Sequence, residues 1–184
     1  MKNICTLGFL IACFALNSFA QERAKEPTNM KLASPAFKMN QRIPIQYSGT
    51  GKDISPALHW SDAPDNVREF ALIVDDPDAP GKTPWVHWVV YKIPASLNNL
   101  PEDLAGNKKS PELASILEGK NSWGTIGYRG PLPPPGHGVH HYHFKLYALR
   151  EPLKVSSGLS AAELTAHMQG LILAEAELIG TFER

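Results

Sequence analysis

The chain has 184 residues, with 18 Lys and Arg against 18 Asp and Glu, so its formal net charge is zero. This length suits one domain with a substantial core, and no internal repeat or low-complexity tract suggests a second one. A nucleic-acid-binding protein needs a basic face, and no block of basic residues supplies one here. Composition and charge therefore argue against nucleic acid as a partner.

The first 20 residues have the layout of a secretory signal peptide. Lys2 supplies a basic start, residues 4–16 form an apolar run, and small residues stand at the cleavage positions before Gln21. The apolar run is shorter than the roughly 20 residues that a membrane span needs, so we expect no integral span in the mature chain. The mature protein is predicted to be periplasmic or secreted.

Both cysteines of the chain, Cys5 and Cys13, lie in this segment. Cleavage after Ala20 leaves a chain without cysteines, which can be exported without forming disulfides. The sequence Leu-Ile-Ala-Cys at residues 10–13 also resembles a lipoprotein box. Attachment as a lipoprotein through Cys13 therefore stays open as the alternative.

The mature chain begins with a polar, aperiodic stretch, and we expect residues 21–34 to be a flexible lead-in to a domain spanning 35–184. Apolar residues alternate within 36–47, which predicts one or two strands, with Pro44 indicating an edge position. A Gly-rich turn follows, and residues 54–60 are predicted to be a loop that enters a short strand.

The middle of the chain predicts the centre of a sheet. Residues 69–75 are strongly apolar and are expected to form a central strand, which ends in an acidic turn over 75–81. Residues 83–93 predict the next strand. The long polar connection 98–119 contains two Pro-Glu sequences, each of which could begin a helical turn.

The C-terminal part combines one helix with a last strand. Ser160 and Glu163 have capping-box spacing, and Leu164 and Met168 follow at helical spacing, so a helix is predicted over 160–169. A short strand is expected at 178–182. The sum is a single-domain, mainly β fold with antiparallel strands and one clear helix.

The most informative stretch is residues 123–149. Its first half, up to Gly138, is rich in glycine and proline and predicts a stiff, sharply turned loop. Its second half alternates and is rich in aromatic and β-branched residues, which predicts a strand. Such a loop delivers histidines onto the first residues of a strand, and we interpret this as one wall of a small polar pocket.

Side-chain alternation along strands sorts these histidines. His140 and Tyr142 share one face of their strand, and His141 and His143 share the other. On the strand over 83–93, Trp85, His87 and Val89 are predicted to share a face.

If the face of Trp85 meets the face of His140, then Asp76, His87, His140 and Tyr142 converge beside an indole wall. Imidazoles and a phenol can donate hydrogen bonds to a phosphate group. The backbone N–H groups of residues 136–138, including Gly138, could add a nest for the anion.

Other interpretations of the same residues remain open. Asp75, Asp76 and Asp78 can simply make turn hydrogen bonds, as Asp often does before Pro. His141 and His143 form an HxH pair that could bind zinc with His137 or Asp78, although such a pair on an exposed strand face is usually plain surface. We expect no metal site, no cofactor and no catalytic nucleophile.

Several motifs resemble the phosphatidylethanolamine-binding protein family, specifically its bacterial branch described as Raf-kinase-inhibitor-like. The motifs are SPALHW at 55–60, DDPDAP at 75–80, WVHW at 85–88, GHGVHHY at 136–142, and the tail AEAELIGT at 174–181. They stand in the family's order over roughly residues 32–184, and the combination is specific.

This resemblance implies a β-sandwich-like fold with a large antiparallel sheet, a smaller sheet and a few peripheral helices. Carried over by motif, it implies a ligand site for a phosphate group. That site comprises Asp76, Asp78, Trp85, His87, Pro134, His140 and Tyr142. It also implies a homodimer.

We therefore expect a binding protein for a phosphorylated small molecule, a lipid head group or a phosphorylated side chain, rather than an enzyme. Two alternatives remain. One is an inhibitor that docks through the Pro-rich loop 131–135, and the other is a weak phosphoester hydrolase that uses His87 and His140 as an acid–base pair.

Overall fold

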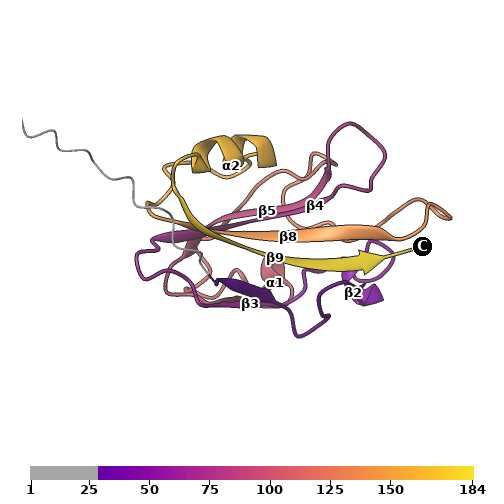
Figure 1. Ribbon diagram of the computed structural model, residues 1–184, viewed down its shortest axis with the longest axis horizontal. Helices are drawn as coiled ribbons and strands as arrows, with labels where there is room; N and C mark the ends of the chain where they lie inside the picture. The colour runs from indigo at the N-terminus through magenta and orange to yellow at the C-terminus, as the bar shows by residue number, and fades with distance from the viewer. Residues whose placement is uncertain (1–28) are drawn as a thin grey trace, which may run out of the picture.

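Figure 1 shows the computed structural model, which describes residues 29–184. The predicted signal peptide 1–20, the lipoprotein position Cys13 and residues 21–28 of the lead-in lie outside the described residues. The elements, in chain order, are β1 (Lys31–Ala33), β2 (Gln41–Arg42), the short 3-10 helix η1 (Ile45–Tyr47), β3 (Leu58–Ser61), β4 (Glu69–Asp76), β5 (Trp85–Pro94), β6 (Asn99–Leu100), α1 (Leu104–Asn107), β7 (Leu117–Glu118), β8 (His140–Leu149), α2 (Ala161–Met168) and β9 (Ile172–Phe182).

Two sheets carry the fold. The large sheet has six strands in the order β2-β9-β8-β4-β5-β7, and the small sheet has three in the order β1-β3-β6. Neighbouring strands are antiparallel except for β2, which pairs with β9 in parallel. This mainly β, two-sheet architecture with few helices confirms the predicted fold class, and β4 holds the predicted central position.

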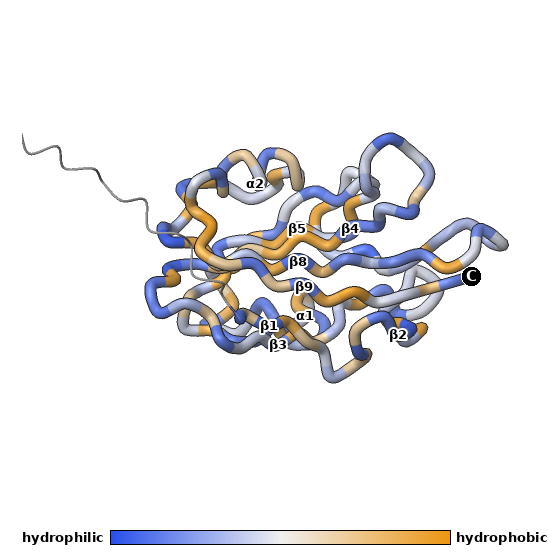
Figure 2. Tube along the Cα trace, viewed as in Figure 1, coloured by the Kyte–Doolittle hydropathy of each residue, from blue (hydrophilic) through white to orange (hydrophobic). Residues whose placement is uncertain are grey.

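The large sheet is covered on both faces. One face packs against the small sheet through a core that includes Leu58 and Trp60 of β3 and Phe144 of β8. The other face is covered by α2, whose Leu164 and Met168 are fully buried in a second core. Figure 1 shows α2 and the small sheet on opposite sides of the large sheet, and Figure 2 shows apolar segments along its central strands. Because both faces are covered, every residue of β4 is buried.

Two N-terminal predictions need correction. Residues 31–33, predicted to belong to the flexible lead-in, form β1, because Leu32 pairs with Trp60 of β3 within the small sheet and is buried in the core. The strands predicted over 36–47 reduce to the two-residue β2 and η1. Asn40 has a left-handed backbone with φ of 58°, and Pro44 precedes the 3-10 turn, so regular pairing is interrupted twice.

The predicted C-terminal helix and the existence of a last strand are confirmed. Helix α2 begins at the predicted capping box, in which the Ser160 hydroxyl accepts from the backbone of Glu163 and the Glu163 carboxylate accepts from the backbone of Ser160. The predicted short strand at 178–182 is too short, since β9 extends from Ile172 to Phe182 and pairs with β8 throughout. Only the first of the two Pro-Glu sequences is followed by a helix, α1, which Asp103 caps.

Candidate functional site

A β-bulge at the start of β5 shapes the site. Val74 pairs with Trp88 and Asp75 pairs with Val86, so His87 is an extra residue without a partner across the ladder. The bulge turns His87 to the side of the sheet on which Trp88 packs, whereas Val89 lies in the core under α2. The predicted common face of His87 and Val89 was therefore wrong, because one inserted residue reverses the alternation.

Beside this bulge lies a cavity of about 290 Å³ at the end of the inter-sheet core. Six of the eight predicted ligand residues line it, namely Asp76, Trp85, His87, Pro134, His140 and Tyr142. The other lining residues are Ala79, Pro80, Trp123, Leu132 and Pro133. The predicted convergence of the two strand faces is thus present, although β5 reaches it through a bulge.

Asp76 and His140 form the buried polar centre. Asp76 is the last residue of β4 and His140 the first of the adjacent antiparallel β8, so the two side chains meet at one end of the sheet. His140 Nδ1 lies 2.7 Å from Asp76 Oδ2, and both side chains are almost fully buried. A carboxylate only accepts hydrogen bonds, so Nδ1 carries the proton and Nε2 is the nitrogen left for other partners.

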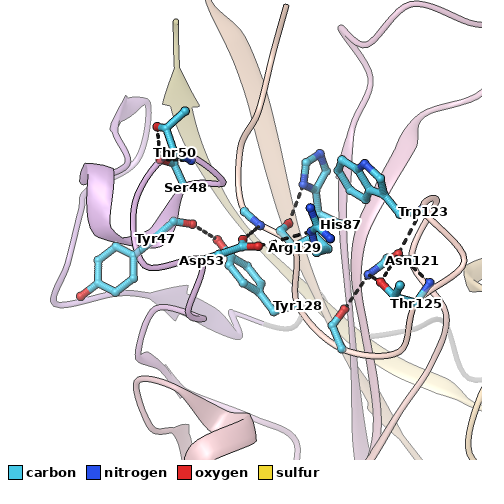
Figure 3. A network of polar contacts seen from close by, with 12 residues as sticks. Tyr47, Ser48, Thr50, Asp53, His87, Asn121, Trp123, Thr125, Tyr128 and Arg129 are labelled. Carbon is cyan, nitrogen blue, oxygen red and sulfur yellow. Dashed lines mark hydrogen bonds and ion pairs between the residues drawn. The ribbon is translucent and has the colours of Figure 1, made fainter.

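His87 is held by the loop that follows Trp123. His87 Nδ1 donates to the backbone carbonyl of Arg129 over 2.7 Å, as Figure 3 shows. Burial lowers the pKa of His87 below its ordinary value, against the raising effect of that carbonyl and of Asp76. His87 is therefore neutral at pH 7, and its free Nε2 is a hydrogen-bond acceptor.

Asp53 anchors the same loop from the other side. Its carboxylate accepts from the backbone N–H of Gly130 over 2.6 Å and forms an ion pair with the Arg129 side chain at 3.3 Å. The Arg129 carbonyl that holds His87 belongs to the same peptide group as the Gly130 N–H that Asp53 accepts from (Figure 3). Asp53 thus positions His87 indirectly, a role that its place in a turn sequence did not reveal.

The Tyr142 hydroxyl is buried near the Asp76 carboxylate, but no residue between 29 and 184 makes a hydrogen bond of good geometry with it. Burial, and then the negative charge of Asp76, raise the pKa of Tyr142 far above its ordinary value, so the side chain is a neutral phenol. A buried donor without a partner is uncommon in folded proteins. Here it belongs to a residue that lines the cavity.

Two tryptophans form the aromatic wall, and sequence reasoning missed one of them. Trp85 and Trp123 pack edge to face with ring centroids 5.3 Å apart, and both are about one-third exposed. The side chain of Asn121 braces the loop by accepting from the backbone N–H groups of Trp123 and Thr125 (Figure 3). Trp123 reaches the cavity from a Gly-rich loop without periodicity, so no sequence pattern pointed to it.

Two predicted ligand residues, Asp78 and Gly138, do not line the cavity. Asp78 Oδ2 accepts from both the backbone N–H and the ring Nδ1 of His141. Partial burial acts to raise the pKa of Asp78, but its bonds to His141 outweigh this and lower it. The backbone N–H of Asp78 donates to Asp76 Oδ1 over 2.9 Å, so this turn orients the buried carboxylate.

The predicted nest over residues 136–138 is not formed as expected. The N–H of Gly136 donates to the carbonyl of Arg184, and the N–H of His137 donates to the carbonyl of Pro134. These bonds turn both donors away from any ligand. They instead fix the loop that carries His137.

The alternative zinc site does not assemble. His141 contacts Asp78 and His143 contacts Glu177, so the two imidazoles have separate carboxylate partners. Within residues 29–184 no group of three or more His, Cys, Asp or Glu is arranged to hold a metal ion. In the same residues no helix is long and apolar enough to cross a membrane.

The sequence pattern of the family described as "Phosphatidylethanolamine-binding protein" matches residues 33–183. The chain belongs to this family. A UPF0098 protein of Aquifex aeolicus is 46% identical over 156 residues, which cover 84% of this chain and 89% of the relative. The crystal structure of Escherichia coli YbcL, described as a member of the mammalian PEBP family, matches with a TM-score of 0.77 and 33% identity over 84% of this chain and 98% of that chain. The family resemblance drawn from the motifs is thereby confirmed.

One relative bears on export. A Mycobacterium tuberculosis protein named "Putative lipoprotein LppC" is 38% identical over 162 residues, covering 87% of this chain and 74% of the relative. Its name fits the lipoprotein alternative for this PEBP-family chain.

Proposed function

We propose that the cavity binds the phosphate group, or a similar small oxyanion, of a small molecule or head group and does no chemistry on it. The observation that carries the proposal is the Tyr142 hydroxyl, a buried donor that no residue between 29 and 184 satisfies with a well-aligned hydrogen bond, beside the buried Asp76–His140 pair. A bound oxyanion would accept from the phenol and from His140 Nε2. Charge-assisted hydrogen bonds of this kind are among the strongest in proteins.

The proposed contacts divide by chemistry. His140 and Tyr142 would donate to the oxyanion, Asp76 and His87 would accept from an N–H or O–H of the ligand, and Trp85 and Pro134 would contact its apolar part. Asp78 and Gly138 would act as supports, through the turn at Asp76 and the loop before β8. The cavity of about 290 Å³ fits a small group and not a whole lipid. The family's name points to a phospholipid head group as one source of the phosphate.

The test is a calorimetric titration of the mature chain with inorganic phosphate and with phosphoethanolamine. His140→Ala is expected to weaken binding roughly 10- to 100-fold, since a hydrogen bond to a charged group contributes about 1.5–3 kcal/mol. The matched control is His143→Ala, which removes an imidazole from the opposite face of the same strand, where it contacts Glu177. Equal affinity of His140→Ala and the wild type would refute the site.

Separate assays address the alternative functions. Turnover of a phosphoester that His87→Ala abolishes would replace the binding function with the hydrolase alternative. Retained phosphate binding by a chain in which residues 131–135 are exchanged would count against these loop prolines as part of the site. Pull-downs in which that chain keeps the partners of the wild type would count against the docking alternative. We further propose export, as a periplasmic, secreted or lipid-anchored protein, and a homodimer, which sedimentation at several concentrations would test.

A further inference from the structure

His137 occupies the nitrogen of His140 that a ligand needs. His137 Nδ1 lies 2.7 Å from His140 Nε2, and the two rings are 5.0 Å apart between centroids. Together with Asp76 they form a chain of three side chains, which runs from the buried carboxylate to an exposed imidazole.

The loop presents His137 for this contact. Gly136 and Gly138 on either side have left-handed backbones, with φ of 74° and 88°, which glycine adopts without strain. The bonds from the backbone of Gly136 to Arg184 and of His137 to Pro134 hold the turn over the start of β8. A Cβ at either glycine would meet no atom within 4 Å, so the turn lies at the surface. The His137 side chain therefore has room to move away from His140.

The protonation pattern follows from the partners. Asp76 accepts, so His140 holds a proton on Nδ1. In neutral His140, Nε2 is then an acceptor, and His137 must donate to it from Nδ1. In this state His140 has no N–H for a ligand in the cavity.

The charge of the cavity lining also indicates that a proton must accompany the ligand. Asp76 is the only Asp, Glu, Lys or Arg among the described residues that line the cavity. Charged residues outside the lining include Asp78, in the turn after β4, and Arg129, which stacks on Trp123 and pairs with Asp53. Arg184 also lies beside the loop of His137, where its backbone carbonyl accepts from Gly136. An oxyanion that enters beside Asp76 therefore meets a like charge unless a proton enters with it.

The remaining neighbours of His140 cannot supply that positive charge. On β5, His87 is kept neutral by burial, and on β8 itself Tyr142 is a neutral phenol. On β9, the register partner of His140 is the apolar Phe182.

We propose that His137 is a gate on the oxyanion site, which opens when His140 takes up a proton on Nε2 and His137 swings into solvent. This inference rests on the proposed function. One proton is consumed for each oxyanion bound, and it converts neutral His140 to an imidazolium between the Asp76 carboxylate and the ligand. His137 gives up one hydrogen bond and keeps its own proton.

The first readout uses sulfate, which stays fully ionised between about pH 5 and pH 8, the range in which histidine titrates. Because sulfate carries no proton, any proton uptake measured by calorimetry in buffers of different ionisation enthalpy comes from the protein. We expect uptake approaching one proton per sulfate at the upper end of this range, and affinity that falls up to about 10-fold per pH unit as pH rises there. Binding without proton uptake would refute the gate.

The second readout removes the gate. His137→Ala is expected to bind sulfate about 2- to 10-fold more tightly near pH 7, because the ligand no longer competes with one hydrogen bond. The control His167→Ala removes an exposed imidazole from α2 and is expected to leave affinity unchanged. Unchanged binding by His137→Ala refutes the gate, and weaker binding refutes it as well, because His137 would then contact the ligand.

These outcomes separate the two proposals. If His140→Ala loses sulfate binding while His137→Ala equals the wild type, the oxyanion site stands and the gate falls. If neither sulfate nor inorganic phosphate binds to the wild type or to His137→Ala at any pH tested, both fall. The ¹⁵N shift of His140 Nε2 gives an independent check, since it must change in His137→Ala without ligand if the hydrogen bond exists in solution.

Discussion

Asp53 lies outside the cavity but should control the position of His87 through the loop that it anchors. Substitution by Ala or by Asn separates the effect of its hydrogen bond from the effect of its charge. Asp53→Ala removes the acceptor for the Gly130 N–H, a bond to a charged group worth about 1.5–3 kcal/mol. Asp53 also has a left-handed backbone with φ of 57°, in which alanine is disfavoured by about 1 kcal/mol. The two effects predict a loss of about 2.5–4 kcal/mol in the free energy of unfolding. Asp53→Asn keeps an acceptor and tolerates this backbone, so it should lose about 1 kcal/mol, mainly from the partly exposed ion pair with Arg129.

The assay is urea denaturation of both variants, combined with phosphate titration. Asp53→Ala should also weaken phosphate binding several-fold, because the Arg129 carbonyl that fixes His87 is released, whereas Asp53→Asn should bind nearly as the wild type does. The ¹⁵N shifts of the His87 ring report the positioning directly and should move only in Asp53→Ala. Equal stability of the two variants, or an undisturbed His87 ring in Asp53→Ala, would refute the reasoning.

Two further predictions concern packing and pH. A Cβ at Gly180 would lie 2.5 Å from Ile43 Cγ1 and 2.7 Å from Phe37 Cε2. Gly180→Ala should therefore lower the free energy of unfolding, measured in urea, by about 1–3 kcal/mol. A change below about 0.5 kcal/mol, roughly the effect of a neutral surface substitution, would contradict this prediction. The pKa of His87 is lower in the folded protein than in the unfolded chain, so between that value and about 6.5 the unfolded chain binds a proton that the folded protein does not, and stability falls as pH falls through this window. His87→Gln should therefore flatten the dependence of urea stability on pH below about 6.5, and a dependence as steep as that of the wild type would show that His87 is not the group responsible.

The predictable parts of the fold were those with a strong local pattern. The capping box at Ser160 and the apolar run of β4 each specify their element without help from distant residues. Residues 36–47 alternate as a strand does, but Asn40 and Pro44 break the pairing, and the sequence did not show that the break at Asn40 would prevail. The extent of β9 was not predicted: Ala174 and Ala176 alternate with glutamates as in a strand, but glutamate-rich stretches also suit helices. Pairing along the whole of β8 decides this case.

The predictable parts of the site were those that follow strand alternation. His140 and Tyr142 lie together in the cavity, and His141 and His143 lie on the other face, as predicted from parity alone. The bulge at His87 could not be predicted, because it depends on how two strands align. Contacts from loops were also out of reach, since Trp123 meets the cavity only after the loop is folded.

The two cavity histidines differ because of what binds Nδ1 in each. In His87 the partner is a neutral carbonyl, burial dominates, and the ring stays an uncharged acceptor. In His140 the partner is a buried carboxylate, which can balance a positive charge on the ring. The bulge brings both rings to one side of the sheet, so one cavity combines a fixed acceptor with an imidazole that faces a buried carboxylate. If the proposed oxyanion site is occupied, this asymmetry would favour a ligand that arrives with a proton, or to which the protein adds one, over an anion held by permanent positive charge.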